Sequence, residues 1–150
     1  MSKAKTVTRG HKVIVRPLAE ADITAVQDLQ RRCFPGIEPW TRAHFLSQIA
    51  EFNEGQIVVE FDGRIVATSS SLIVDTESYD RAHTLGEVSD SGYIRTHDEE
   101  GDALYGIDIA VDPKFRGLRL ARRIYEARKA IIRERNLRRF LIAGRIPGYH

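Results

Sequence analysis

The chain of 150 residues is 42% hydrophobic and 29% charged, with a formal net charge of +2, which is the composition of one folded domain with its own core. This composition excludes a disordered chain, and the small net charge does not require a nucleic acid as partner. The single cysteine, Cys33, excludes an internal disulfide, and no apolar run approaches the roughly 18 residues of a membrane-spanning helix. We therefore expect a cytoplasmic protein that does not associate with membranes.

The N-terminal third predicts one strand and two helices. The basic start, residues 1–11, is not followed by an apolar segment and is expected to be a flexible tail. Residues 12–16 alternate in polarity as a strand does, and residues 19–32 carry apolar side chains at helical spacing. Thr41 is a suitable N-cap for a second helix over residues 42–51.

The middle of the chain predicts a hairpin followed by a long connection. Residues 56–61 and 64–74 are rich in β-forming side chains, and the Asp62-Gly63 pair between them is a strong signal for a two-residue turn. These two strands should therefore be antiparallel neighbours. Residues 75–102 are polar and acidic, and we expect a long connection with a short helix around residues 89–96.

The C-terminal third predicts a strand, a helix and a final strand. Residues 103–111 are rich in β-branched side chains, and a helix follows over residues 117–135, with Asn136 as its C-cap. Residues 139–144 form the last expected strand. The buried stripe of the helix is expected to be Leu120, Ile124, Ala127 and Ile131. The order of elements predicts a mixed α/β fold with at least five strands in a single domain, residues 1–150.

The junction between the long strand and the helix carries the strongest functional signal. Residues 116–121 form a turn that leads into the helix N-terminus, where unsatisfied N–H groups and partial positive charge suit a phosphate. Arg116, Arg119, Arg122 and Arg123 crowd the same place, where each cation opposes the helix dipole at a cost of about 0.3–1 kcal/mol. A bound polyanion turns this penalty into attraction. The sequence therefore predicts a diphosphate site for a nucleotide-containing cofactor.

Residues 109–124, IAVDPKFRGLRLARRI, and the order of the elements resemble the GNAT superfamily of N-acetyltransferases. The family pattern is an apolar strand ending near Val-x-Pro, an aromatic residue, the sequence (Gln/Arg)-x-x-Gly-x-(Gly/Ala) and an amphipathic helix. Here Arg116 takes the first position of that sequence and Ala121 the last, while Arg119 stands at the internal glycine. The resemblance implies an α+β fold whose mixed, mainly antiparallel sheet is flanked by helices.

The resemblance also implies a site for acetyl-CoA as a cosubstrate, without a metal. The backbone around Ile109 and Val111 would pair with the pantetheine arm like an added strand, and the N–H groups of the turn would hold the pyrophosphate. An outward Arg119 side chain could pair with a phosphate directly. The cofactor-binding residues predicted in this way are Ile109, Ala110, Val111, Arg116, Gly117, Leu118, Arg119, Leu120, Ala121 and Arg122.

The end of the sequence resembles only part of the family. Family members usually continue after the last expected strand with another helix and two strands, and we expect these elements to be absent here. The ending GRIPGYH is similar to a subgroup in which the acetyltransferase-like domain precedes a carbon–nitrogen hydrolase domain.

Three residues are candidates for the acid–base steps that acetyl transfer to an amine requires. Asp108 would face the side of the strand opposite Ile107 and Ile109 and serve as the base; the alternative is an ordinary hydrogen-bonded aspartate. Glu87, in the acidic connection, is a second carboxylate that could reach the acceptor. Tyr149 could protonate the departing thiolate, by analogy with a tyrosine that some family members use; the alternative is a loop aromatic.

The remaining candidates have simpler interpretations. Cys33 is expected to be buried between the first helix and the sheet, because no partner histidine can be assigned to it. The histidines lack the spacing of metal ligands. Phe34 and Trp40 either line the mouth of the acceptor site or fasten the loop between the first two helices.

The sequence thus predicts an N-acetyltransferase that moves an acetyl group from acetyl-CoA to a primary amine by direct transfer. The expected acceptor is a small-molecule amine, a lysine or an N-terminal amine; the acidic connection suggests a polyamine or lysine, unless it is simply a solvated face. One alternative is a non-catalytic acyl-CoA-binding or regulatory domain. The other, a nucleic-acid-binding module, lacks interleaved aromatic platforms. A homodimer is compatible with the sequence.

Overall fold

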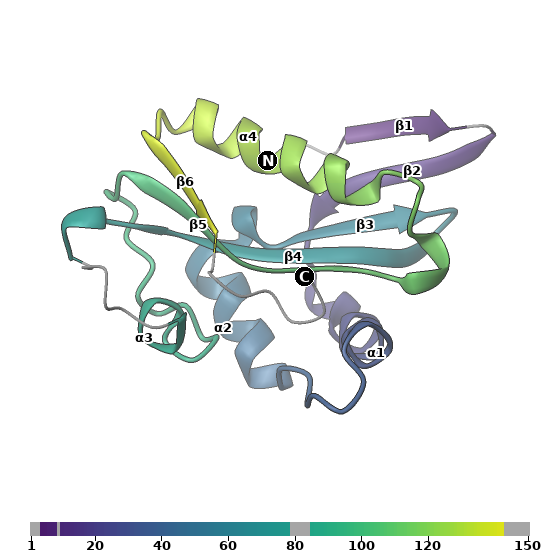
Figure 1. Cartoon of the computed structure of the whole chain (residues 1–150), viewed down its shortest axis with the longest axis horizontal. Helices are drawn as coiled ribbons and strands as arrows, with labels where there is room; N and C mark the ends of the chain where they lie inside the picture. Colours follow the sequence, from purple (N-terminus) through teal and green to yellow (C-terminus); the bar gives the residue numbers. More distant parts are fainter. Residues whose placement is uncertain (1–3, 9, 79–84, 143–150) are drawn as a thin grey trace.

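The computed structural model describes residues 4–8, 10–78 and 85–142, which form a six-stranded sheet with helices on both faces (Figure 1). The strands lie in the order in which they occur in the chain, and all neighbours are antiparallel except β5 and β6, which are parallel. They are β1 (Ala4–Thr8), β2 (His11–Pro17), β3 (Ile57–Phe61), β4 (Arg64–Val74), β5 (Ala103–Val111) and β6 (Arg139–Ile142). The predicted mixed, mainly antiparallel sheet is confirmed.

Helices cover both faces of the sheet because each presents an apolar stripe to it. They are α1 (Ile23–Cys33), α2 (Arg42–Phe52), α3 (Leu85–Ser89) and α4 (Leu120–Glu134). Figure 1 shows α4 on one face and α1, α2 and α3 on the other. Val26 of α1 and Phe45 of α2 pack with Val58 of β3, whereas Leu120 and Ile124 of α4 belong to the main core cluster. Strand β5 is thereby held between α4 on one face and α1 on the other.

The N-terminal residues correct one expectation. The flexible tail predicted over residues 1–11 is wrong for β1, which pairs with β2 from Ala4 opposite Val15 to Thr8 opposite His11. The physical reason is a β-branched run, Thr6-Val7-Thr8, followed by Gly10 in the left-handed region (φ 82°), a combination that favours a hairpin.

Two local signals in the first half of the chain are confirmed. Asp62 and Gly63 are both left-handed (φ 51° and 82°), as a two-residue turn between β3 and β4 requires. Thr41 caps α2: its Oγ1 accepts the His44 N–H (3.4 Å), and His44 Nδ1 accepts the Thr41 N–H (3.0 Å). Separate contacts join the loop before α2 to α1: Gln27 Nε2 donates to the Trp40 carbonyl (3.0 Å), and the Trp40 N–H donates to Gln30 Oε1 (3.1 Å).

Helix α4 ends at Glu134, one residue before the predicted end, and begins three residues later than predicted. At its C-terminus Asn136 is left-handed (φ 54°), and the Leu137 N–H bonds back into the last turn (2.9 Å), which is the Schellman arrangement. Gly117, the expected first residue, is left-handed (φ 91°), as is Arg119 (φ 60°). A regular helix therefore starts only at Leu120.

The acidic connection contains a helix earlier than expected. The short helix predicted around residues 89–96 is wrong: α3 ends at Ser89, because Asp90, Ser91 and Gly92 all take positive φ values. Val88 and Ile94, which are fully buried, anchor this segment in the core. The connection is thus packed against the sheet where the structure describes it.

Candidate active site at the open edge of β5

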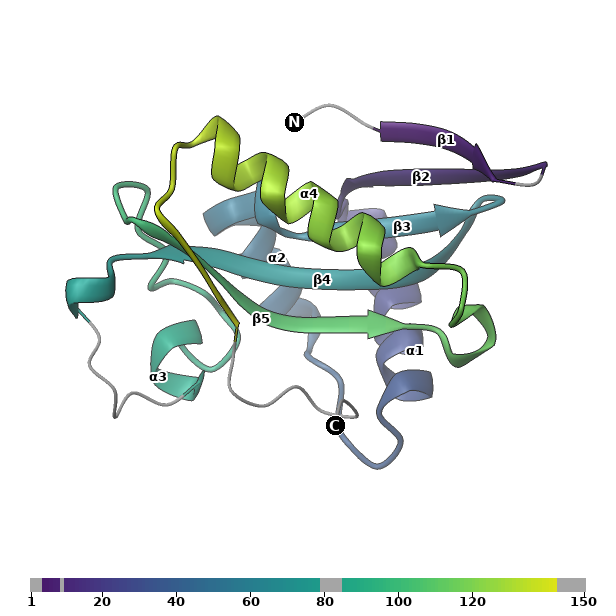
Figure 2. The same cartoon turned by 45° about the horizontal axis from the view of Figure 1, so that its top comes forward.

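The candidate site begins where the sheet opens between its last two strands. β6 pairs with β5 only over residues 103–106, and among the residues that the structure describes no strand pairs with the rest of that edge. Figure 2 shows β6 turning away from the C-terminal half of β5. Residues 107–111 therefore offer backbone N–H and C=O groups to an extended, amide-bearing chain that adds as a strand.

The alternating direction of the backbone hydrogen bonds identifies the residues whose N–H and C=O groups point to this edge. The Asp112 N–H donates to the Val66 carbonyl across β4 (2.8 Å). Because successive residues of an antiparallel strand direct their N–H and C=O groups to opposite sides, Ala110 also points to β4. By the same alternation Ile109 and Val111 point to the open edge. They are the residues whose backbone the sequence assigns to the cofactor arm.

A β-bulge lies at the point where β6 leaves β5. Ser70 is opposite Asp108, but Ser71 is opposite Gly106, so Ile107 is the extra residue. At the bulge the Ser70 N–H donates to Oδ1 of the Asp108 side chain (2.7 Å). The bulge therefore places a carboxyl group, instead of a backbone carbonyl, against β4.

Arg128 of α4 occupies the same bulge from the opposite face. Its Nη2 donates to the carbonyl oxygens of Ser70 (3.0 Å) and Asp108 (2.9 Å), and the residue is only 1% exposed. The sequence interpretation missed Arg128. The available signal was its spacing, because Arg128 follows Ile124 by four residues and so lies on the buried stripe of α4.

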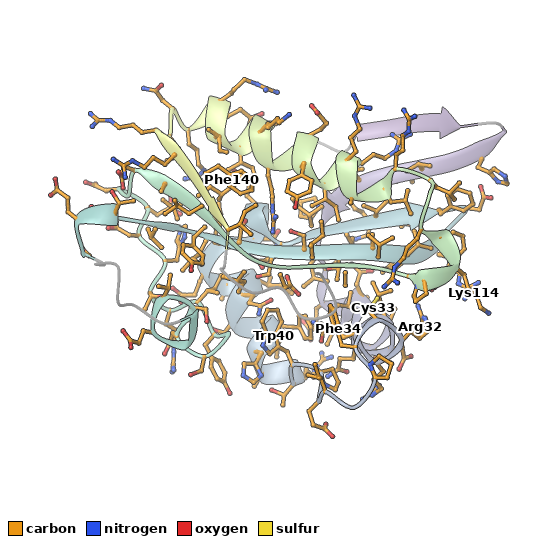
Figure 3. The ribbon with its side chains drawn as sticks, in the orientation of Figure 1. Arg32, Cys33, Phe34, Trp40, Lys114 and Phe140 are labelled. Atoms are coloured by element: carbon orange, nitrogen blue, oxygen red, sulfur yellow. The ribbon has the colours of Figure 1, made fainter. Side chains whose placement is uncertain are left out.

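The turn that leaves β5 is held at its base by Asp112. This aspartate is buried; its Oδ1 accepts the Lys114 N–H (3.0 Å), and its Oδ2 pairs with the guanidinium of Arg32 on α1 (3.0 Å). Figure 3 shows Arg32 and Lys114 at the same end of the molecule. The turn is therefore tied both to β5 and to α1 before it reaches α4. Neither Asp112 nor Arg32 was predicted as a site residue.

The N-terminus of α4 has no side-chain cap. Arg119 is the N-cap residue, in the left-handed conformation (φ 60°, ψ 31°), and its side chain makes no capping hydrogen bond. This is a conformation that glycine adopts readily and other residues adopt at a cost, and Arg119 stands at the position of the glycine in the GNAT pattern. The first N–H groups of α4 lack a side-chain partner from the N-cap, and together with the helix dipole they favour an anion.

A groove of about 500 Å³ runs beside α4 on its β2 side. Its lining residues are Val15, Leu118, Arg119, Arg122, Arg123, Glu126, Ala127 and Ala130. Arg119 and Arg122 are exposed, as are Arg116 and Gly117 in the turn. Three arginines of the groove thus lie close to the uncapped helix end, which makes this region electropositive.

Asp108 lies on the face of β5 that α1 covers. Its carboxyl accepts the Ser70 N–H and a hydrogen bond from the Gln30 side chain of α1. Burial raises the pKa of Asp108 to about 6, and the charge of Arg128 and the two hydrogen bonds oppose that rise. A carboxyl group with such a pKa can exchange a proton with a reacting group near neutral pH.

The other two acid–base candidates are not brought to Asp108 by the described structure. Glu87 is exposed on α3, and Tyr149 lies outside the described residues. The catalytic roles of all three residues therefore stay predictions.

Cys33 is buried between α1 and the sheet, as predicted. It is 8% exposed, its Sγ donates to the Val111 carbonyl (3.3 Å), and burial raises the pKa of its thiol. Phe34 packs with Cys33 and Ala110, and Trp40 contacts Phe45 edge-on with ring centroids 5.9 Å apart. Figure 3 shows Cys33, Phe34 and Trp40 on the α1–α2 side of the sheet.

Two further properties concern only the described part of the chain. It contains no group of three or more His, Cys, Asp or Glu side chains placed to hold a metal ion. None of its helices has both the length and the apolarity needed to cross a bilayer.

Comparison with protein families gives a match over most of the chain. The profile described as "Acetyltransferase (GNAT) family" matches residues 23–146. The probable hydrolase YhcX of Bacillus subtilis (strain 168) is 44% identical over 151 residues, which cover 100% of this chain and 29% of YhcX. The uncharacterized N-acetyltransferase YkwB of the same organism is 33% identical over 140 residues, which cover 91% of this chain and 62% of YkwB. The chain thus spans less than two thirds of either relative.

Solved structures share the fold. A GphF GNAT-like decarboxylase in complex with isobutyryl-CoA has a TM-score of 0.68 and 24% identity, with 79% of this chain and 58% of that one covered. The aminoglycoside N-acetyltransferase AAC(6')-Iy in complex with CoA has a TM-score of 0.64 and 15% identity, with 93% and 82% covered. At these identities the likeness describes the fold alone.

Proposed function

Because the chain belongs to the GNAT family of acetyltransferases, we propose that it binds acetyl-CoA along the open edge of β5 and transfers the acetyl group to a primary amine. The observation that carries the proposal is the continuity of two features. Among the residues that the structure describes, no strand covers the edge of β5 facing away from β4 from Ile107 onward, and the same strand leads through one turn to the uncapped N-terminus of α4. An amide-bearing arm followed by a diphosphate fits this order of groups.

The arm would form hydrogen bonds with the edge groups of Ile109 and Val111. The pyrophosphate would lie at the N–H groups of residues 117–121, with Arg116, Arg119 and Arg122 able to approach it because all three are exposed. Exposed guanidinium groups are well suited to phosphate oxygens, since they donate in a planar fork. Arg119 is compatible with this arrangement because it is exposed and its side chain makes no capping hydrogen bond.

The chemical step would be direct attack of the amine nitrogen on the thioester carbonyl carbon. The Ile109 N–H would donate to the carbonyl oxygen as negative charge develops there. The Asp108 carboxylate, directly or through a water, would take the proton that the attacking nitrogen loses, and CoA would leave as the thiolate and then be protonated. Tyr149 is the proposed proton donor in that last step, and Glu87 is the second candidate for the base.

The proposed acceptor is a cationic amine such as a polyamine or a lysine. The support is the acidic connection, which carries Glu87, Asp90, Asp98, Glu99 and Glu100. Part of this charge is neutralised within the protein, because Arg95 pairs with Asp90 and Arg135 pairs with Glu99. A neutral amine should therefore be tested beside the cationic ones.

A second candidate function is a non-catalytic domain that senses acyl-CoA. The observation that favours it is the relative YhcX, which is named a probable hydrolase and of which this chain matches 29%. Both candidates require acyl-CoA binding, but only the transferase requires thiol release that depends on an amine.

Calorimetric titration with acetyl-CoA tests the shared requirement. We expect Arg116→Ala and Arg119→Ala each to weaken binding roughly fivefold, as loss of an exposed charged contact of about 1 kcal/mol implies. If neither variant binds more weakly, the placement of the pyrophosphate is wrong. Thiol release measured with spermidine, lysine and peptide N-termini then separates the candidates. Turnover that Asp108→Asn abolishes without weakening binding supports the transferase, and binding without turnover with any amine supports the sensor.

A further inference from the structure

Arg128 joins four elements at the point where β5 and β6 separate. It projects from α4, its Nη2 donates to carbonyl oxygens of β4 and β5, and its guanidinium lies over the ring of Phe140 on β6 (5.7 Å to the centroid). The two carbonyl acceptors are Ser70 and Asp108, the residues opposite one another at the bulge.

The guanidinium is held in this position although burial is unfavourable for it. Its Nε is buried without a hydrogen-bond partner, and burial lowers the pKa of Arg128. A Cβ at Gly106 would lie 2.9 Å from both Cζ and Nη1, so the residue at position 106 must be glycine for the guanidinium to fit. A buried charge with an unpaired donor stabilises a fold little, since an apolar side chain of similar size would fill the same space without the cost of desolvating a charge. The contact is better explained by its effect on the backbone that it touches.

That backbone is the peptide unit that links Asp108 to Ile109. Arg128 donates to the carbonyl oxygen at one end of this unit, and the N–H at its other end belongs to Ile109, which points to the open edge. A charged donor on a peptide carbonyl withdraws electron density from the peptide and strengthens the N–H of the same unit as a donor. The guanidinium is screened little by water because it is buried.

We propose that Arg128 is a positioning residue that fixes and polarises the 108–109 peptide, so that the Ile109 N–H becomes a stronger donor to the thioester oxygen of the bound acyl-CoA. The proposal rests on the proposed function, because it needs acyl-CoA at the open edge of β5. Arg128 touches neither substrate. It acts on the reaction through the peptide and also through its charge, which lowers the pKa of the Asp108 carboxyl, so the state of the thioester oxygen and not the rate alone must test the effect on the peptide. Its loss should therefore lower the rate of acyl transfer more than the affinity for acyl-CoA.

The test is the ¹³C chemical shift of acetyl-CoA labelled at the thioester carbonyl and bound in the absence of an amine. A hydrogen bond to that oxygen moves the signal downfield, and the wild-type protein should show such a shift on binding. Arg128→Met, which removes the charge and keeps the volume, should lose about half of the shift or more. In turnover assays kcat should fall roughly tenfold while the KM for acetyl-CoA stays within about twofold.

Gly106→Ala disturbs the same contact from the other side and keeps the charge. Its Cβ displaces the flexible end of Arg128, so it should reduce the shift even if Arg128→Met does not fold. Arg133→Met, an exposed arginine of the same helix, is the matched control and should retain the wild-type shift.

The outcomes separate the two hypotheses. Absence of acetyl-CoA binding by the wild type would refute the proposed function itself. Binding with a wild-type downfield shift in a folded Arg128→Met or Gly106→Ala protein would refute the role of Arg128 and leave the proposed function standing. Loss of the shift in these variants, with binding retained and the control unchanged, supports the proposal.

Discussion

Replacement of Arg119 by glycine should make the protein more stable and its binding of acetyl-CoA weaker. Arg119 takes the left-handed conformation at the N-cap of α4 and is exposed. An L-residue in this region costs about 1–2 kcal/mol relative to its right-handed form, whereas glycine adopts it without penalty. The arginine also places a cation at the positive end of the helix dipole, which costs about 0.3–1 kcal/mol.

The expected net effect follows from these terms and one that opposes them. Glycine also makes the unfolded chain more flexible, which lowers the free energy of unfolding by about 0.5–1 kcal/mol. Arg119→Gly should therefore raise the free energy of unfolding by about 1 kcal/mol, a Tm increase of roughly 2–4 °C for a chain of this length. Loss of an exposed charged contact with a phosphate should weaken acetyl-CoA binding roughly fivefold.

Two further variants separate the backbone from the charge. Arg119→Ala removes the charge but keeps a side chain in the left-handed region, so it should lose affinity like the glycine variant and gain less stability. Asn136→Gly changes the left-handed residue at the other end of α4, and should gain about 0.5 kcal/mol with unchanged affinity, because asparagine already tolerates this conformation. Denaturant unfolding and calorimetry measure the two quantities. Tighter acetyl-CoA binding by Arg119→Gly would refute the reasoning, since Arg119 would then obstruct the phosphate.

Three other predictions concern groups around the site. Burial raises the pKa of Asp108 from 3.8 to about 6, so the native state binds this proton more tightly than the unfolded chain. About 3 kcal/mol of the free energy of unfolding, present below pH 4, should therefore be lost as the pH rises through 6. Denaturant unfolding of Asp108→Asn across this range should show no such loss. Asp112→Ala removes the acceptor of the Lys114 N–H and the partner of Arg32, so the free energy of unfolding measured with denaturant should fall by about 1–3 kcal/mol. An unchanged midpoint would show that these two contacts of Asp112 do not stabilise the turn. Alkylation of Cys33 should be at least about tenfold slower in the native than in the unfolded protein, because burial raises the pKa of its thiol; equal rates would show that it is accessible.

The elements that the sequence predicts well are those with strong local chemistry. Asp62-Gly63 can serve few structures other than a tight hairpin, and Asn136 stops α4 because it tolerates a left-handed backbone. Residues 4–8 form a strand only by pairing with β2, which local propensity does not encode. The end of α3 does have a local signal, because Asp90, Ser91 and Gly92 are turn-forming residue types, and the helix predicted around residues 89–96 passes over it.

The candidate site divides in the same way. The turn and the helix N-terminus are contiguous in the chain, so a motif can identify them. Arg128, Asp112 and Arg32 act through contacts with distant segments, such as the 58-residue separation between Arg128 and Ser70, and no local pattern encodes these pairings. A charged residue at a buried helix position is the one available signal for Arg128, and its meaning requires the position of the bulge.

The conformation of Arg119 explains how a motif can lose its glycine and keep its shape. Glycine in such a turn can provide two different things: access to a left-handed backbone and absence of a side chain. In this chain an arginine takes a left-handed backbone at that position (φ 60°), so the conformation is available without glycine and only the absence of a side chain is given up. A side chain that points outward and carries a positive charge does not block a polyanion but attracts it. If the proposed pyrophosphate site is correct, this position requires a left-handed conformation and a clear approach to the N–H groups, and the charge of Arg119 would offset the strain of about 1–2 kcal/mol by assisting binding.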